Sequence, residues 1–100
     1  MNLKPQDAIV TITYVSESRT RATWDRPDGR RRFVIGAEIV GADELNKRLG
    51  LTTLDPWKAS ACIQARDKRL QLHIKFRETK YFDADLLFVE FMKEPVSANG

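Results

Sequence analysis

The sequence contains only one cysteine, Cys62, and only one histidine, His73. A single cysteine excludes an internal disulfide, and these two residues are too few to build a zinc site. No stretch of about 18 apolar residues occurs, so we expect no membrane-spanning helix and no membrane partner. The opening residues MNLKPQD lack the apolar core of a signal peptide, and we expect a cytoplasmic protein. We also predict that the protein uses no metal and no cofactor.

The residues that catalysis needs are equally sparse. No glycine-rich phosphate loop is present. We expect His73 and Cys62 on outward positions of adjacent strands, but no carboxylate lies near them in the sequence to orient the imidazole. Asp83 and Asp85 are two residues apart, and we interpret them as solubilising residues or helix-start charges and not as an acid–base pair. We therefore predict that the protein is not an enzyme.

What is present indicates one compact domain. The chain has 100 residues, of which 42% are hydrophobic and 31% are charged, a balance typical of a soluble globular protein. The polar, proline-containing stretches at residues 1–7 and 95–100 are expected to be flexible tails.

The net charge is only +3, but the charges are unevenly distributed along the chain. Residues 19–32 contain six arginines against two aspartates, and residues 66–80 contain six basic residues against two acidic ones. Residues 81–100 reverse the sign, with four acidic residues against one lysine. Such asymmetry can steer an anionic partner toward the basic segments.

Residues 8–15 are predicted to form the first strand. They are rich in β-branched side chains, and their alternation places Val10, Ile12 and Tyr14 on one face. Residues 16–18, Ser-Glu-Ser, are predicted to form a turn that ends this strand.

A hairpin is predicted around the segment WDRPDGRRRF, residues 24–33, in which Pro-Asp-Gly indicates a tight turn. A four-residue loop would pair Asp25 with Arg30, whereas a three-residue loop would pair Arg26 with Arg30. The first register places Trp24, Phe33 and Ile35 together on a core face, and we prefer it because register follows the buried face. The opposite face then carries Arg19, Arg21, Arg30 and Arg32.

Residues 42–50 are predicted to form one short helix in the middle of the chain. The first turn is acidic, the last turn is basic, and Gly50 provides a stop signal. Leu45 and Leu49, four residues apart, form its apolar stripe.

Residues 57–66 and 69–77 are predicted to pair as a second hairpin. Asp55-Pro56 has the form of a helix start, but the residues from Trp57 to Ala65 alternate between apolar or small and polar side chains. Because a period of two is typical of a strand, we predict a strand over 57–66. The alternation of Leu70, Leu72, Ile74 and Phe76 predicts the strand over 69–77.

The segment around residues 86–92, LLFVEFM, is apolar on nearly every side. Its charged flanks favour a helix, whereas its aromatic and β-branched content favours a strand, and the pattern leaves both open for residues 83–93. A small domain seldom covers both faces of a terminal element, so we expect a second copy of the chain to cover one. The predicted dimer interface is Leu87, Val89 and Phe91, or else Leu86 and Phe88.

These elements predict an α+β fold. An antiparallel sheet of five or six strands is built from hairpins, with one short helix in mid-chain. The alternative is a small, partly open β-barrel made from the same elements.

The charge pattern suggests a binding function. We expect a non-enzymatic interaction module, homodimeric, that presents Arg19, Arg21, Arg30 and Arg32 to an acidic protein partner. The alternative is sequence-nonspecific nucleic-acid binding by the same face, with Trp24, Trp57 and Tyr14 available for stacking. The alternation argues against this alternative in part, because it sends the tryptophans to the core face and the arginines to the other.

Overall fold

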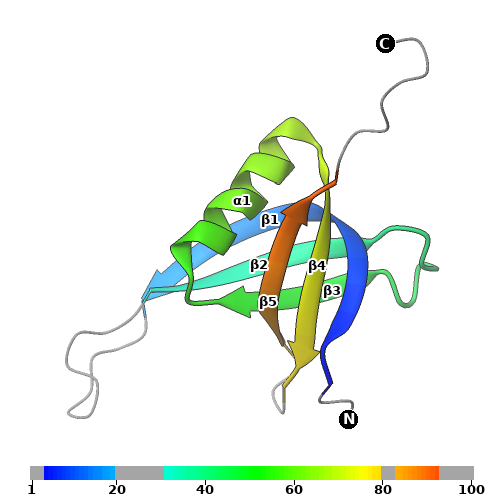
Figure 1. Ribbon diagram of the computed structural model, residues 1–100, viewed down its shortest axis with the longest axis horizontal. Coiled ribbons are helices and arrows are strands. Elements are labelled where there is room, and N and C mark those ends of the chain that lie inside the picture. Colours follow the sequence, from blue (N-terminus) through cyan, green and yellow to red (C-terminus); the bar gives the residue numbers. More distant parts are fainter. Residues whose placement is uncertain (1–3, 20–30, 80–82, 93–100) are drawn as a thin grey trace.

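The computed structural model describes residues 4–19, 31–79 and 83–92 (Figure 1). In chain order, the elements are β1 (Gln6–Arg19), β2 (Arg31–Ile39), β3 (Arg48–Thr53), α1 (Pro56–Lys68), β4 (Gln71–Glu78) and β5 (Ala84–Phe91). Gln6 and Asp7, predicted to lie in a flexible tail, open β1 instead. The segment whose secondary structure was left open is the strand β5.

The five strands form a closed barrel in the order β1-β2-β3-β5-β4, and β4 pairs back onto β1. All neighbours are antiparallel except β3 and β5, which are parallel and pair only at Leu51–Ala84 and Thr52–Asp85. The predicted antiparallel sheet is therefore confirmed only in part, and the small barrel is the better description. A five-stranded barrel with this strand order, closed by one short pairing and carrying a helix between β3 and β4, has the topology of an OB-fold.

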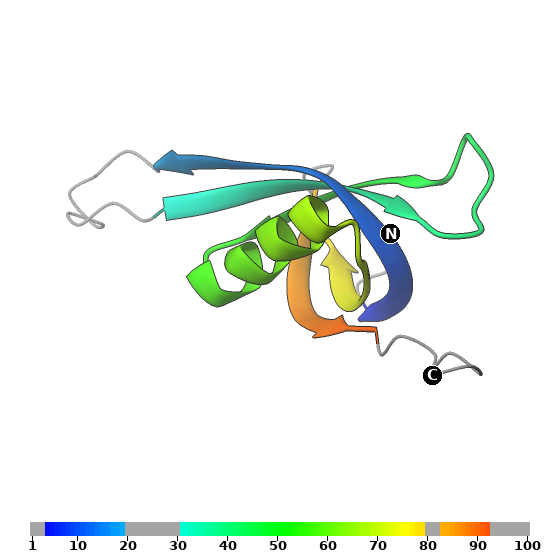
Figure 2. The ribbon, with the colours of Figure 1, turned by 90° about the horizontal axis from the view of Figure 1, so that it is seen from above.

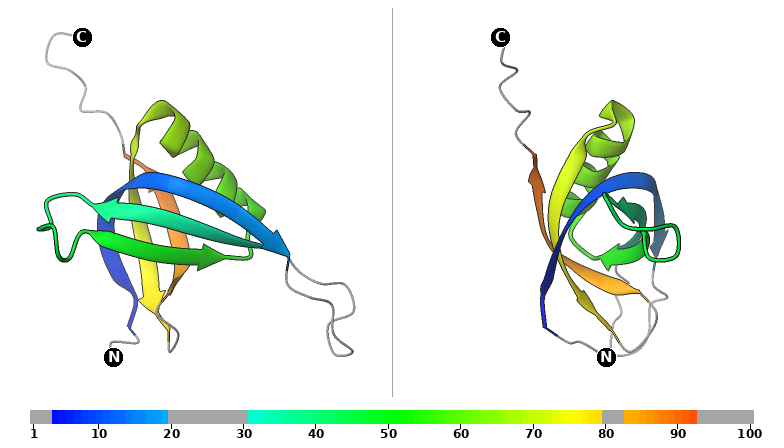
Figure 3. Two further views of the ribbon diagram at one scale, coloured as in Figure 1. Left: turned by 180° about the vertical axis from the view of Figure 1, so that it is seen from behind. Right: turned by 90° about the vertical axis from the view of Figure 1, so that its right-hand side faces the viewer.

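Strand β1 is long because it belongs to two parts of the barrel. Its first half pairs with β4 and its second half with β2, and it curves between them (Figure 2 and Figure 3). The turn predicted at residues 16–18 is absent, since β1 runs through it to Arg19. The register to β2 shifts between Ile12 and Tyr14, which makes Thr13 the extra residue of a β-bulge.

The bulge reverses which side chains of β1 face the core. Val10 and Ile12 are buried, and after the extra residue Val15 packs against the core. Tyr14 is 52% exposed on the outer face. The prediction that Tyr14 shares a face with Val10 and Ile12 is wrong for this reason.

β1 and β2 pair antiparallel, as the predicted hairpin requires, but not in the predicted register. Arg19 pairs with Arg31 and Phe33 pairs with Glu17, whereas pairing Asp25 with Arg30 would set Phe33 opposite Ala22. The observed register keeps Ile35 opposite Val15 on the core side. The predicted turn and Trp24 lie outside the described residues.

Residues 56–68 form a helix, not the predicted strand. Asp55 is the N-cap and accepts a hydrogen bond from the Trp57 backbone N–H at 2.9 Å, and Pro56 follows at the start of the helix. The buried side chains are Ala59, Cys62 and Ala65, a stripe of small residues three apart. Small side chains on alternate positions had suggested a strand, but here they let α1 pack closely against β1, β2, β3 and β5.

Residues 42–50 do not form the predicted helix. The Asp43 carboxylate accepts hydrogen bonds from the backbone N–H groups of Leu45 and Asn46, at 3.1 and 3.0 Å, which makes a turn. Leu45 is 94% exposed, so it cannot anchor a helix stripe. Leu49 instead belongs to β3 and packs on the core.

Strand β4 is confirmed, but its predicted hairpin partner is wrong. Because residues 57–66 are helical, β4 pairs with β1 on one side and with β5 on the other. The core lies between the barrel wall and α1; its fully buried members include Val10, Ile35, Leu51, Cys62, Leu72 and Ile74.

Candidate functional site

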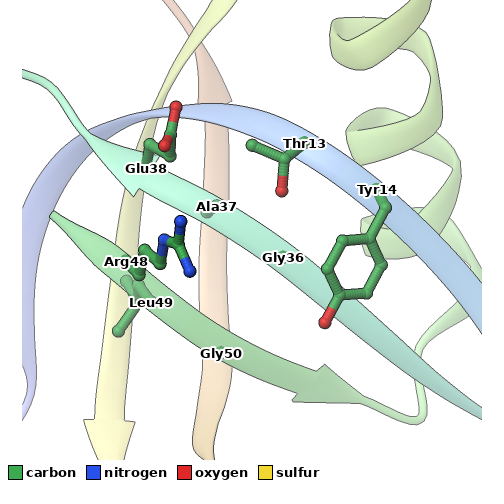
Figure 4. Close-up of a pocket in the computed structure, with 8 residues that line it drawn as sticks. All are labelled: Thr13, Tyr14, Gly36, Ala37, Glu38, Arg48, Leu49 and Gly50. Atoms are coloured by element: carbon green, nitrogen blue, oxygen red, sulfur yellow. The ribbon is translucent and has the colours of Figure 1, made fainter.

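The outer face of β1, β2 and β3 contains a hollow floored by two glycines. Gly36 of β2 and Gly50 of β3 are direct cross-strand partners, so no side chain rises from either position. The hollow has a volume of about 450 Å³ (Figure 4). Its lining consists of Thr13, Tyr14, Gly36, Ala37, Glu38, Arg48, Leu49 and Gly50. A glycine pair in neighbouring strands is typical of a place where another group approaches the backbone closely.

Tyr14 covers the Gly36 side of this hollow. The two residues are cross-strand partners, and a β-carbon added to Gly36 would overlap the Tyr14 ring. The ring lies across β2 with its broad face turned outward (Figure 4). An aromatic side chain that packs over a strand glycine is held in place by it. Tyr14 therefore presents a fixed, accessible aromatic surface.

Charged side chains lie at one end of the hollow, and the Asp83 carboxylate lies close to Gly50, 3.2 Å from the position of an added β-carbon. Glu38 and Arg48 are direct cross-strand partners, yet Glu38 forms its ion pair with Lys47, at 3.4 Å. Lys47 also donates a hydrogen bond to Glu44 at 3.1 Å. The bonds to Glu44 and Glu38 raise the pKa of the Lys47 ammonium above its ordinary value. The positive charge of Lys47 is thus balanced by the two carboxylates. Arg48, in contrast, has no ion pair within the described part of the chain.

Of the four predicted arginines, the structure places only one side chain on this face. Arg32 is exposed and shares the outer face of β2 with Gly36. Arg19 ends β1, its side chain is not among those described, and Arg21 and Arg30 lie outside the described residues. Arg32 makes no ion pair in the described ranges, whereas its neighbour Arg31 pairs with Glu17 at 3.1 Å.

The basic residue that sequence reasoning missed is Arg48. It was assigned to the last turn of a helix that does not exist, and the strand β3 turns it toward the hollow instead. The signal that could have found the site is the pair of isolated glycines, but their juxtaposition requires the β2–β3 register. Along the strand direction, Arg32 and Arg48 lie on opposite sides of Tyr14. Six residues of β2, or about 20 Å, separate Arg32 from Glu38, which is the cross-strand partner of Arg48.

Of the predicted dimer residues, Val89 and Phe91 share one face of β5, and Leu87 is set apart from them. The β4–β5 register shifts around Leu87, which is half-buried in a second bulge. Val89 packs against the core, and Phe91 is 37% exposed at the end of β5. Phe88, from the other predicted set, is 39% exposed, whereas Leu86 is buried. Self-association through this strand stays a prediction.

The remaining reactive groups lie apart from the hollow. Cys62 lies on the buried face of α1, and burial raises the pKa of its thiol to about 11. The prediction that Cys62 and His73 occupy outward positions of adjacent strands is therefore wrong. His73 Nε2 lies 2.8 Å from Asp7 Oδ1 on the outer face of β1 and β4, beside a second hollow of about 560 Å³. Within the described ranges, no three His, Cys, Asp or Glu side chains are grouped to hold a metal.

Comparison with known proteins identifies no relative. No family model matches the chain, and no curated protein or solved structure matches it either. Among the described residues, no helix is long and apolar enough to cross a membrane.

Proposed function

We propose that the outer face of β1, β2 and β3 binds single-stranded nucleic acid, with one base stacked on Tyr14. The observation that carries the proposal is the Tyr14 ring, which is 52% exposed and fixed over Gly36 beside a hollow. Stacking on an aromatic ring stabilises a bound base by about 1–3 kcal/mol. A base inside a duplex has both faces covered by its neighbours, so this platform favours an unpaired strand.

The cations on this face are positioned to contact phosphates. Arg32 and Arg48 lie on either side of the platform, and neither is occupied by an acidic side chain of the described chain. A backbone that passes over Tyr14 could meet one arginine before the stacked base and the other after it. Guanidinium groups bind phosphate oxygens in a bidentate manner, and such contacts weaken as salt rises.

This proposal replaces the acidic protein partner as the leading function. That partner was expected to meet four arginines, of which only the Arg32 side chain is described on this face. An acidic peptide also gains little from an aromatic platform above a glycine floor. Five-stranded barrels of this topology often bind oligonucleotides on the face of the second and third strands. This is a precedent at the level of the fold only, and function depends on the Tyr14 ring and the two arginines.

The test is a titration of a labelled thymine oligonucleotide at low salt, followed by fluorescence anisotropy. We expect micromolar binding to the single strand, weaker binding to a duplex, and a dissociation constant at least about fivefold higher for Tyr14→Ala. Tyr14→Phe should retain binding. Trp57→Ala is the matched control, because Trp57 is an 84% exposed aromatic on α1, away from this face.

Arg48→Ala should weaken binding. It should also reduce the slope of the logarithm of the binding constant against the logarithm of the salt concentration by about one, the loss of one phosphate contact. Failure of the wild-type protein to bind any oligonucleotide at low salt would contradict the proposal. If an acidic peptide bound under the same conditions instead, the function would revert to recognition of an acidic protein.

A further inference from the structure

Glu38 and Arg48 form an unusual pair at the end of the hollow. They face each other across β2 and β3, where opposite charges ordinarily bond, but no ion pair joins them. Figure 4 shows the carboxylate and the guanidinium apart, each beside the hollow. Glu38 instead forms an ion pair through its Oε2 atom with Lys47 Nζ. The Glu38 side chain is still 37% exposed.

The two side chains offer opposite hydrogen-bonding groups to one ligand. A carboxylate only accepts hydrogen bonds, with about four acceptor sites on its two oxygens, so Lys47 does not exhaust it. A guanidinium only donates. A ligand that fits both must carry adjacent donors and acceptors on its edge.

Nucleobases differ in how hydrogen-bond donors and acceptors are arranged along their edges. Guanine carries the N1–H and N2–H donors side by side, next to the acceptors O6 and N7. Adenine and cytosine each carry one amino donor beside acceptors. Thymine and uracil carry a single N–H flanked by two carbonyl oxygens, which a carboxylate repels.

We infer that Glu38 and Arg48 make this site selective for guanine, with thymine and uracil bound least tightly. In this arrangement Glu38 accepts from N1–H and N2–H. Arg48 donates to O6 or N7 with part of its guanidinium, and its remaining N–H groups contact the neighbouring phosphate. The inference rests on the proposed function, because the base must first be placed on Tyr14. A well-formed bidentate contact to a base discriminates against the wrong base by roughly tenfold or more.

The experiment compares three short thymine oligonucleotides whose central base is guanine, hypoxanthine or thymine. Hypoxanthine is guanine without its 2-amino group, and a single guanine in a thymine strand cannot assemble into a quadruplex by itself. We expect binding to weaken in the order guanine, hypoxanthine, thymine, with about a tenfold ratio between the first and last.

Two variants test whether Glu38 causes this order. Glu38→Gln should bring the guanine-to-thymine ratio close to one. Glu44→Gln is the matched control, because Glu44 also pairs with Lys47 but is 85% exposed and does not line the hollow. The control should keep the wild-type ratio.

The outcomes separate the two proposals. Equal binding of all three oligonucleotides, or a ratio that survives Glu38→Gln, would overturn the guanine selectivity and leave single-strand binding standing. Absence of binding to every oligonucleotide would overturn both.

Discussion

The ring of Tyr14 occupies the space that a β-carbon of Gly36 would need. This relationship depends on the bulge at Thr13, which turns Tyr14 outward and sets it opposite Gly36. The glycine makes room for the ring, and the ring covers the backbone of the glycine, which is buried. The platform and its support are therefore one structural unit, although they lie on different strands.

Gly36→Ala is expected to displace the Tyr14 ring. The added methyl should lower the free energy of unfolding by about 1 kcal/mol through overpacking, and binding of a thymine oligonucleotide should fall as it does for Tyr14→Ala. In a Tyr14→Ala background the same change should cost less, because only the Thr13 hydroxyl, 2.8 Å from the added β-carbon, still crowds it. A urea-unfolding cycle over the four proteins measures this coupling. Additive effects would show that the ring does not rest on Gly36.

Ile63 distinguishes the helix over 56–68 from the strand that its alternation suggests. In the helix Ile63 is 37% exposed, so Ile63→Ala should cost less than about 1 kcal/mol. Ala65 is fully buried, and Ala65→Leu should cost about 1–3 kcal/mol because the helix would be pushed from the barrel. Urea midpoints give both values. A loss above about 2 kcal/mol for Ile63→Ala would indicate a core position instead.

The Cys62 thiol should make the protein less stable in alkali. Its pKa is raised by burial from 9.0 to about 11, so between these values the folded state holds a proton that the unfolded state has lost. Stability from this group is present below about pH 9 and declines as pH rises toward 11. Cys62→Ala should show a shallower decline of the urea midpoint over this range. Parallel slopes for the two proteins would contradict a buried, protonated thiol.

Self-association through β5 is expected from its exposed apolar side chains. Phe88, Phe91 and Met92 are 39%, 37% and 39% exposed, respectively. Light scattering at high micromolar concentration should give the mass of a dimer, and Phe91→Glu should give a folded monomer. A wild-type protein that stays monomeric at this concentration would rule the dimer out. Circular dichroism of the variant checks that it is folded.

Sequence reasoning succeeded where the pattern was local. The alternations in residues 8–15, 33–35 and 69–77 identified parts of β1, β2 and β4 correctly, because each of these strands has one face on the core. It failed for α1, where the buried stripe is made of Ala59, Cys62 and Ala65 and carries little hydrophobic contrast. The N-cap Asp55 and Pro56 were the better signal there.

The site was harder to predict because it depends on register. A single extra residue, Thr13, turned Tyr14 from an expected core residue into a surface one. Gly36 and Gly50 become neighbours only when β2 and β3 pair, and the closure of β3 on β5 is a parallel contact between distant segments. No periodicity within one segment reports such a contact.

The most direct test of the account is a map of the backbone amides that respond to a short single-stranded oligonucleotide. An amide-resolved NMR titration should shift the signals of Tyr14, Gly36 and Gly50 first, and the shifts should fade in Tyr14→Ala. The signals of Ile9 and His73, on the outer face of β1 and β4, should stay unchanged. Shifts centred on Ile9 and His73, with Gly36 and Gly50 unaffected, would contradict the placement of the binding face on β1, β2 and β3.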